Sequence, residues 1–120
     1  MASDSYHEPP DILSRETRLL HQAITSLMEE LEAVDWYQQR IDATTDAELK
    51  MILAHNRDEE KEHAAMVLEW LRRRDPCLDE QLKTYLFTSG DVAAQEEADT
   101  GTPASGSESL GIGSLRKAGD

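Results

Sequence analysis

The chain has 120 residues, a formal net charge of −13 and a sequence pI near 4.6. The length favours a single domain, and the negative charge argues against nucleic acid or an anionic membrane as the main partner, because both require a basic surface. Metal cations remain compatible partners of such a chain. The lone Cys77 excludes an internal disulfide and favours a reducing compartment. Residues 1–10 show no secretory pattern, and no stretch approaches the roughly 20 apolar residues of a membrane span, so we expect a cytoplasmic protein.

Two long helices are predicted in the first two thirds of the chain. Residues 1–8 are polar and are expected to be disordered. From about Asp11 the apolar residues recur at helical spacing, which predicts a helix ending near Asp42. Thr45 and Glu48 then form a T-x-x-E capping box, which predicts that a second helix begins there. The short connection makes the two helices an antiparallel hairpin.

A proline marks the predicted end of the second helix. That helix should stop before Asp75, and Pro76 should open a short third helix. The helical domain is therefore expected to span residues 9–98. Residues 99–109 form a Gly/Ser/Thr-rich linker with little to bury. Apolar residues return in 110–120, which indicates a docking peptide, with an unstructured terminus as the alternative.

Polar residues interrupt the apolar faces of both long helices at the same height. Glu30 projects onto the apolar stripe of the first helix, and Glu60 and His63 form a Glu-x-x-His pair on the stripe of the second. At roughly 1.5 Å per residue, Glu30 and Glu60 both lie on the order of 20 Å from the turn. Taken singly, each residue is more often a solvent-edge carboxylate or a core histidine. Together they predict a metal site.

The predicted ligands are half of the ligand set that di-iron centres in helical bundles use. A di-iron centre in a helical bundle uses one glutamate from each of two helices and a Glu-x-x-His pair from each of the other two. One chain supplies Glu30, Glu60 and His63 on two long helices. A two-fold dimer would complete both the ligand set and a ferritin-like four-helix bundle.

Several segments of the sequence resemble the encapsulated ferritins, the cargo proteins of encapsulin nanocompartments. The similarity lies in residues 29–37 (EELEAVDWY), 55–66 (HNRDEEKEHAAM), 68–73 (LEWLRR) and 84–87 (TYLF). The tail 110–116 (LGIGSLR) resembles the peptide that directs cargo into encapsulin shells.

The resemblance implies a ferroxidase that oxidises Fe(II) to Fe(III) at a di-iron site between two subunits. Carried over by motif position, the iron ligands would be Glu30, Glu60 and His63, with Tyr37 as a nearby catalytic group. An outer site through which metal enters would comprise Glu29, Glu32 and Trp36, and would hold Ca²⁺ or another divalent metal.

The resemblance also implies an assembly and a location. Dimers would form a ring of five, a decamer, and residues 110–117 would bind the shell protein. The protein would then lie inside an encapsulin compartment in the cytoplasm, and the shell would store the mineral. The alternative is a non-catalytic helical protein, either metal-binding or structural, that serves as cargo or adaptor of the shell.

Overall fold

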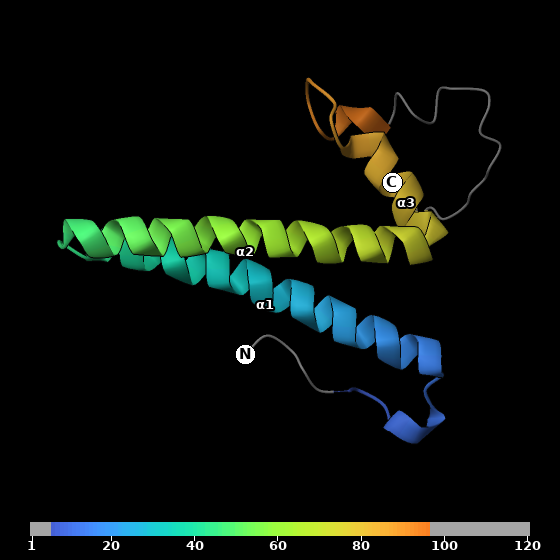
Figure 1. The fold of residues 1–120 in the computed structure, drawn as a ribbon. Helices are drawn as coiled ribbons and strands as arrows, with labels where there is room; N and C mark the ends of the chain where they lie inside the picture. The colour runs from blue at the N-terminus through green and yellow to red at the C-terminus, as the bar shows by residue number, and fades with distance from the viewer. Residues whose placement is uncertain (1–5, 97–120) are drawn as a thin grey trace. The chain divides into compact units, whose positions relative to one another are not determined.

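The computed structural model describes residues 6–96, and the regular secondary structure in that range is helical. A short 3₁₀ helix, η1 (Pro10–Ile12), precedes three α-helices, α1 (Arg15–Ala43), α2 (Ala47–Arg74) and α3 (Pro76–Tyr85), as Figure 1 shows. The all-α prediction, with a two-helix hairpin and a short third helix, is confirmed. The predicted linker 99–109 and docking peptide 110–120 lie outside the described residues.

The first long helix begins later than its apolar pattern predicted. Ser14 is the N-cap of α1, and its hydroxyl oxygen accepts a hydrogen bond from the backbone N–H of Thr17 at 3.0 Å. The start near Asp11 was therefore about four residues early, because Pro10 opens the separate turn η1. The helix ends at Ala43, next to the predicted Asp42.

The capping box predicted for the second helix was wrong. The N-cap of α2 is Asp46, whose carboxylate oxygen accepts from the backbone N–H of Leu49 at 2.8 Å. A carboxylate is well suited to this place, because it also interacts favourably with the positive end of the helix dipole. Thr45 precedes that cap. At the other end, α2 stops at Arg74 and α3 begins at Pro76, as predicted.

The hairpin of α1 and α2 buries very little of its own surface. The two helices run antiparallel and contact each other (Figure 1). Among the described residues, only Thr25, Ala64 and Leu71 are buried. Large apolar side chains along the hairpin stay exposed, among them Ile24, Met28, Leu31, Ile52 and Met66. Since exposed apolar area of this extent usually marks an interaction surface, the hairpin has the character of part of a bundle.

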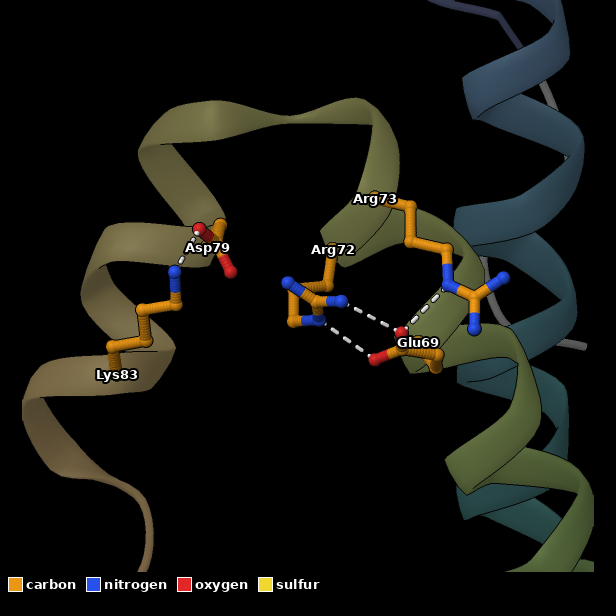
Figure 2. Close-up of polar contacts among 5 residues, drawn as sticks. All are labelled: Glu69, Arg72, Arg73, Asp79 and Lys83. Atoms are coloured by element: carbon orange, nitrogen blue, oxygen red, sulfur yellow. Dashed lines mark hydrogen bonds and ion pairs between the residues drawn. The ribbon is translucent and has the colours of Figure 1, made fainter.

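The chain divides after Pro76 into two compact units, and the second is described from Cys77 to Glu96. Within it, Lys83 and Asp79 form an ion pair at 3.0 Å along α3 (Figure 2). The segment after the helix turns through Phe87 and Gly90, which both have positive φ, and the Phe87 side chain is fully exposed. No helix in the described part of the chain is both long and apolar enough to cross a membrane.

Candidate metal centre

Glu30 of α1 and Glu60 and His63 of α2 meet halfway along the hairpin. One ligand atom from each residue can be chosen so that all three lie within 4.8 Å of one another. The Nδ1 atom of His63 lies 3.3 Å from a carboxylate oxygen of Glu60 and 3.7 Å from one of Glu30. The Glu60 and His63 side chains share a helix face because they stand three positions apart. The antiparallel packing of α1 then brings Glu30 to the same height.

Hydrogen bonds among the three side chains shift the pKa values of all three. A hydrogen bond with Glu60, together with burial, raises the pKa of Glu30. The same hydrogen bond lowers the pKa of Glu60. A hydrogen bond with Glu60 also raises the pKa of His63. In the described part of the chain, neither carboxylate pairs with a lysine or arginine.

The cluster is accessible from outside the hairpin. The side chains of Glu30 and Glu60 are 26% and 23% exposed, and that of His63 is 41% exposed. Beyond the cluster, the Nε2 atom of His63 lies 3.9 Å from a carboxylate oxygen of Glu59. Glu59 in turn lies 3.9 Å from His55. A cation can therefore reach the three side chains from solvent while one wall of the site is formed by the hairpin.

The donor set fits a divalent transition metal. Carboxylate oxygens are hard ligands, and imidazole suits zinc, copper, iron and nickel. The three side chains of one chain leave open several positions of a five- or six-coordinate metal. Further donors must come from water, from substrate or from another protomer, which matches the half-set predicted from the sequence.

The other predicted site residues lie on α1 outside this three-residue cluster. Tyr37 is half-buried two turns after Glu30, and its ring is covered by the Arg40 guanidinium at 5.6 Å. Glu29 and Glu32 are half-buried, and Trp36 is 44% exposed. The roles predicted for these four residues remain predictions.

Sequence reasoning missed a polar contact that joins the two long helices between the cluster and the turn of the hairpin. The Nη1 atom of Arg57 donates a hydrogen bond to the side-chain oxygen of Gln38 at 2.7 Å, across 19 residues of sequence. The Arg57 side chain is 22% exposed. Nothing in the local spacing of the sequence indicates such a pair, because the contact depends on how α1 and α2 are aligned.

A second polar cluster stands at the C-terminal end of α2, and its carboxylate is already neutralised. Figure 2 shows Glu69 between Arg72 and Arg73. Arg72 donates two hydrogen bonds to Glu69, at 2.7 and 2.8 Å, and Arg73 donates one at 2.7 Å. These arginines, Arg72 foremost, lower the pKa of Glu69 to about 2. Glu69 therefore has little capacity left for a metal ion.

The fold and the first cluster together define a class of protein. An α-helical hairpin that presents Glu30 against a Glu-x-x-His pair, with its apolar faces uncovered, is ferritin-like in its fold and in the type of its candidate metal centre.

The comparisons with known proteins identify the family within that class. The sequence pattern of the EncFtn-like family matches residues 5–89. An encapsulated ferritin-like protein of Rhodospirillum rubrum is 60% identical over 96% of this chain and 90% of its own length. An encapsulin nanocompartment cargo protein of Myxococcus xanthus is 36% identical over 85% of this chain and 88% of its own length. A crystal structure of a protein from Nitrosomonas europaea has 65% sequence identity and a TM-score of 0.73, and the match covers 74% of this chain and 98% of that one. The chain belongs to the EncFtn-like family of encapsulated ferritins.

Proposed function

We propose that this protein is a ferroxidase whose di-iron site forms between two protomers. The observation that carries the proposal is the convergence of Glu30, Glu60 and His63 within 4.8 Å, with neither carboxylate paired to lysine or arginine in the described part of the chain. The ligand atoms are those that bundle-type di-iron proteins use, in half the required number. Membership of an encapsulated-ferritin family supports the same reading.

Charge balance is compatible with a di-iron site made by two copies. Each protomer contributes two carboxylates to the cluster, Glu30 and Glu60, so two protomers contribute four. Two Fe²⁺ ions carry four positive charges, which those carboxylates neutralise. A two-fold axis makes each residue contribute twice, and it places a second Glu-x-x-His pair opposite the first.

The surface of the hairpin also favours a dimer. Met66, which is 58% exposed, lies one turn after His63 and lines a shallow groove of about 360 Å³ together with apolar residues such as Leu19, Val67 and Trp70. Ile24, Met28 and Leu31 are exposed along α1 near Glu30. Burying apolar area of this kind contributes roughly 25 cal/mol per Å². A second hairpin laid over these faces would form the four-helix bundle, and a ring of five such dimers is the larger assembly we propose.

Iron is the substrate of the proposed reaction. Each Fe²⁺ gives up one electron, and an O₂ molecule that takes up two electrons and two protons becomes hydrogen peroxide, while four of each yield water. Glu30 and Glu60 hold the ions and stabilise Fe³⁺ more strongly than Fe²⁺, because hard anionic oxygens prefer the higher charge. Neutral His63 contributes a lone pair. Tyr37 would stand near the site, and Glu29, Glu32 and Trp36 would form the outer site for incoming metal or Ca²⁺.

The names of two relatives support an encapsulin compartment as the location. One relative is named an encapsulated ferritin-like protein and another an encapsulin nanocompartment cargo protein. We propose that this chain is likewise enclosed in an encapsulin shell in the cytoplasm. Residues 110–117, which lie outside the described part of the chain, would bind the shell protein. Fe³⁺ released from the site would then be stored as mineral within the shell.

An anaerobic Fe²⁺ titration followed by admission of air tests the proposal. Oxidation and oligomer mass are recorded for the wild type and for Glu60→Ala, with Glu62→Ala as the matched control, since Glu62 is an exposed glutamate outside the cluster. We expect rapid oxidation and a dimer-based mass in wild type and in the control, and loss of oxidation in Glu60→Ala. Slow oxidation that is equal in all three proteins would instead leave a non-catalytic cargo or adaptor protein.

A further inference from the structure

The two halves of the candidate centre stand on different helices and must be kept in register before metal arrives. Glu30 stands on α1, whereas Glu60 and His63 stand on α2. When metal is absent, the two carboxylates repel each other unless they share a proton. At this height the cluster joins α1 and α2 through the side-chain contacts of Glu30 with Glu60 and His63. A further contact between the two helices near the cluster would add to what holds them in register.

The contact between Arg57 and Gln38 lies in the right place. Arg57 precedes Glu60 by three residues on α2, about 4.5 Å along the helix axis. Its guanidinium reaches Gln38 of α1 at 2.7 Å. On α1, Gln38 follows Glu30 by eight residues, about 12 Å along the helix axis. The contact thus stands between the turn of the hairpin and the cluster.

Both ends of this contact are fixed by further hydrogen bonds. The Nε atom of Arg57 donates to a carboxylate oxygen of Asp58 at 2.9 Å, while Nη1 is used for Gln38. Gln38 donates from its side-chain nitrogen to Asp42 at 3.1 Å. That bond fixes the orientation of the amide, because a flipped amide would turn its NH₂ group toward the guanidinium. We name the three residues Asp42, Gln38 and Arg57, which form the bond between the helices and fix its amide, the cross-helix clamp.

We propose that Arg57 is a positioning residue for the metal centre: through Gln38 it sets the separation and register of α1 and α2 that keep Glu30 within ligand distance of Glu60 and His63. Arg57 has no role as a ligand. This inference rests on the proposed function in that the site it positions is the proposed iron site. A hydrogen bond to a charged group that sets the geometry of a site is expected to change metal affinity roughly three- to tenfold.

Substitution of Arg57 distinguishes the clamp from a simple charge effect, because the two predict opposite changes in the affinity for a metal cation. Arg57→Met keeps an unbranched apolar stem and removes both the donors and the charge. Loss of a nearby positive charge should strengthen cation binding, whereas loss of the clamp should weaken it. Lys61→Met is the matched control, since Lys61 is a cation on the same helix that pairs with Asp58 at 3.4 Å and makes no bond to α1 in the described structure.

The experiment titrates the full-length protein with Co²⁺, read by its visible absorption, and measures Fe²⁺ oxidation rates over a range of iron concentrations. We expect Arg57→Met and Gln38→Leu each to weaken Co²⁺ binding and raise KM about three- to tenfold, with kcat within about twofold of wild type. Lys61→Met should bind Co²⁺ as tightly as wild type or slightly more tightly. The double variant Gln38→Arg with Arg57→Gln reverses donor and acceptor at constant charge and should restore affinity to within about twofold.

Tighter Co²⁺ binding by Arg57→Met, or equal weakening by Lys61→Met, would overturn the inference. Failure of the reversed pair to restore Co²⁺ affinity would also overturn the inference, provided that its oligomer mass and helicity match those of wild type. If wild type binds no Co²⁺ at all, the proposed function fails, and the clamp is then judged by hydrogen exchange. Amides of α1 around Glu30 should exchange faster in Arg57→Met and return to wild-type rates in the reversed pair, and unchanged rates would refute the clamp.

Discussion

Helix α2 carries two glutamates with a basic partner three residues on, and the two sites have opposite chemistry. Glu60 is followed by His63 and Glu69 by Arg72, and both partners lie within hydrogen-bonding distance of their glutamate. Arginine stays charged at any accessible pH and offers only donors, so Glu69 is fully neutralised. Histidine loses its proton near neutrality and then offers a lone pair. The same spacing therefore gives two kinds of site. We call Glu69 and Arg72 the closed site, which is unsuited to a metal ion, and Glu60 and His63 the open site, which can bind one.

A third residue at each site increases the difference in charge between the two sites. At the open site, α1 contributes Glu30, a second acid, which leaves an excess of negative charge for a cation to neutralise. At the closed site, Arg73 adds a second base to Glu69, also through a hydrogen bond (Figure 2). Three arginines occupy the last turn of α2, where the negative end of the helix dipole favours them. These arginines thus favour the end of the helix and leave Glu69 little capacity for a metal ion.

The largest expected effect comes from converting the open site into the closed one. His63→Arg removes the imidazole lone pair and adds a permanent charge next to Glu60. We expect Co²⁺ affinity and Fe²⁺ oxidation to fall by more than about a hundredfold, since even indirect disturbance of a metal site commonly costs 10- to 100-fold. Isothermal titration with Co²⁺ and a stopped-flow oxidation assay measure the two quantities. Arg72→His makes the reverse change at the closed site and should leave both values unaltered.

A somewhat smaller effect is expected from removing one negative charge. Glu30→Gln keeps the size of the side chain and one oxygen donor but reduces the charge of the cluster. We expect Co²⁺ affinity to fall roughly tenfold or more, because a neutral amide oxygen is a weaker ligand for a hard cation than a carboxylate. Glu69→Gln serves as the control at the closed site. Equal affinities in the two variants would show that Glu30 is no ligand.

Metal binding should also depend on pH in a way that belongs to the open site alone. The pKa of His63 is raised above its ordinary value of 6.5, so the metal-free imidazole keeps its proton to higher pH than usual. Protons and metal compete for the same nitrogen. Co²⁺ affinity should therefore fall as the pH is lowered through a midpoint above 6.5, with release of protons on binding. Titrations in buffers of different ionisation enthalpy count those protons, and affinity independent of pH between about 6 and 8 would exclude His63 as a ligand.

The smallest effect concerns stability and the closed site. The pKa of Glu69 is lowered from 4.5 to about 2, so its ion pairs stabilise the folded state above pH 4.5, and this contribution is lost as the pH falls toward 2. Glu69→Gln should therefore lower the melting temperature slightly near neutral pH, and the difference from wild type should shrink below pH 4.5. The effect stays small because the group is exposed to solvent. Thermal melts followed by circular dichroism measure it, and a difference that grows in acid would contradict this sign.

Much of the fold could be predicted from local sequence because the signals are local. Helical periodicity located α1 and α2, and Pro76 marked the start of α3 to the residue. Where two local signals competed, sequence reasoning chose wrongly: Asp46 caps α2 in place of Thr45. Both are good N-cap residue types, and only the observed path of the turn decides between them. The predicted meeting of Glu30 with the Glu-x-x-His pair holds because the short connection makes the hairpin antiparallel and leaves Glu30 and Glu60 at about the same distance from the turn.

The sequence by itself determined the all-α class, the hairpin and the residue types of the candidate metal centre, since spacing along a helix fixes which side chains share a face. Tertiary structure decided which residues meet across helices. It joined Arg57 to Gln38 over 19 residues of sequence, which no periodicity encodes. It also showed that one hairpin leaves its apolar faces exposed, with only Thr25, Ala64 and Leu71 buried in the described chain. The physical reason is that helical spacing orders neighbours within one element, whereas separation and alignment between elements arise only when their surfaces pack.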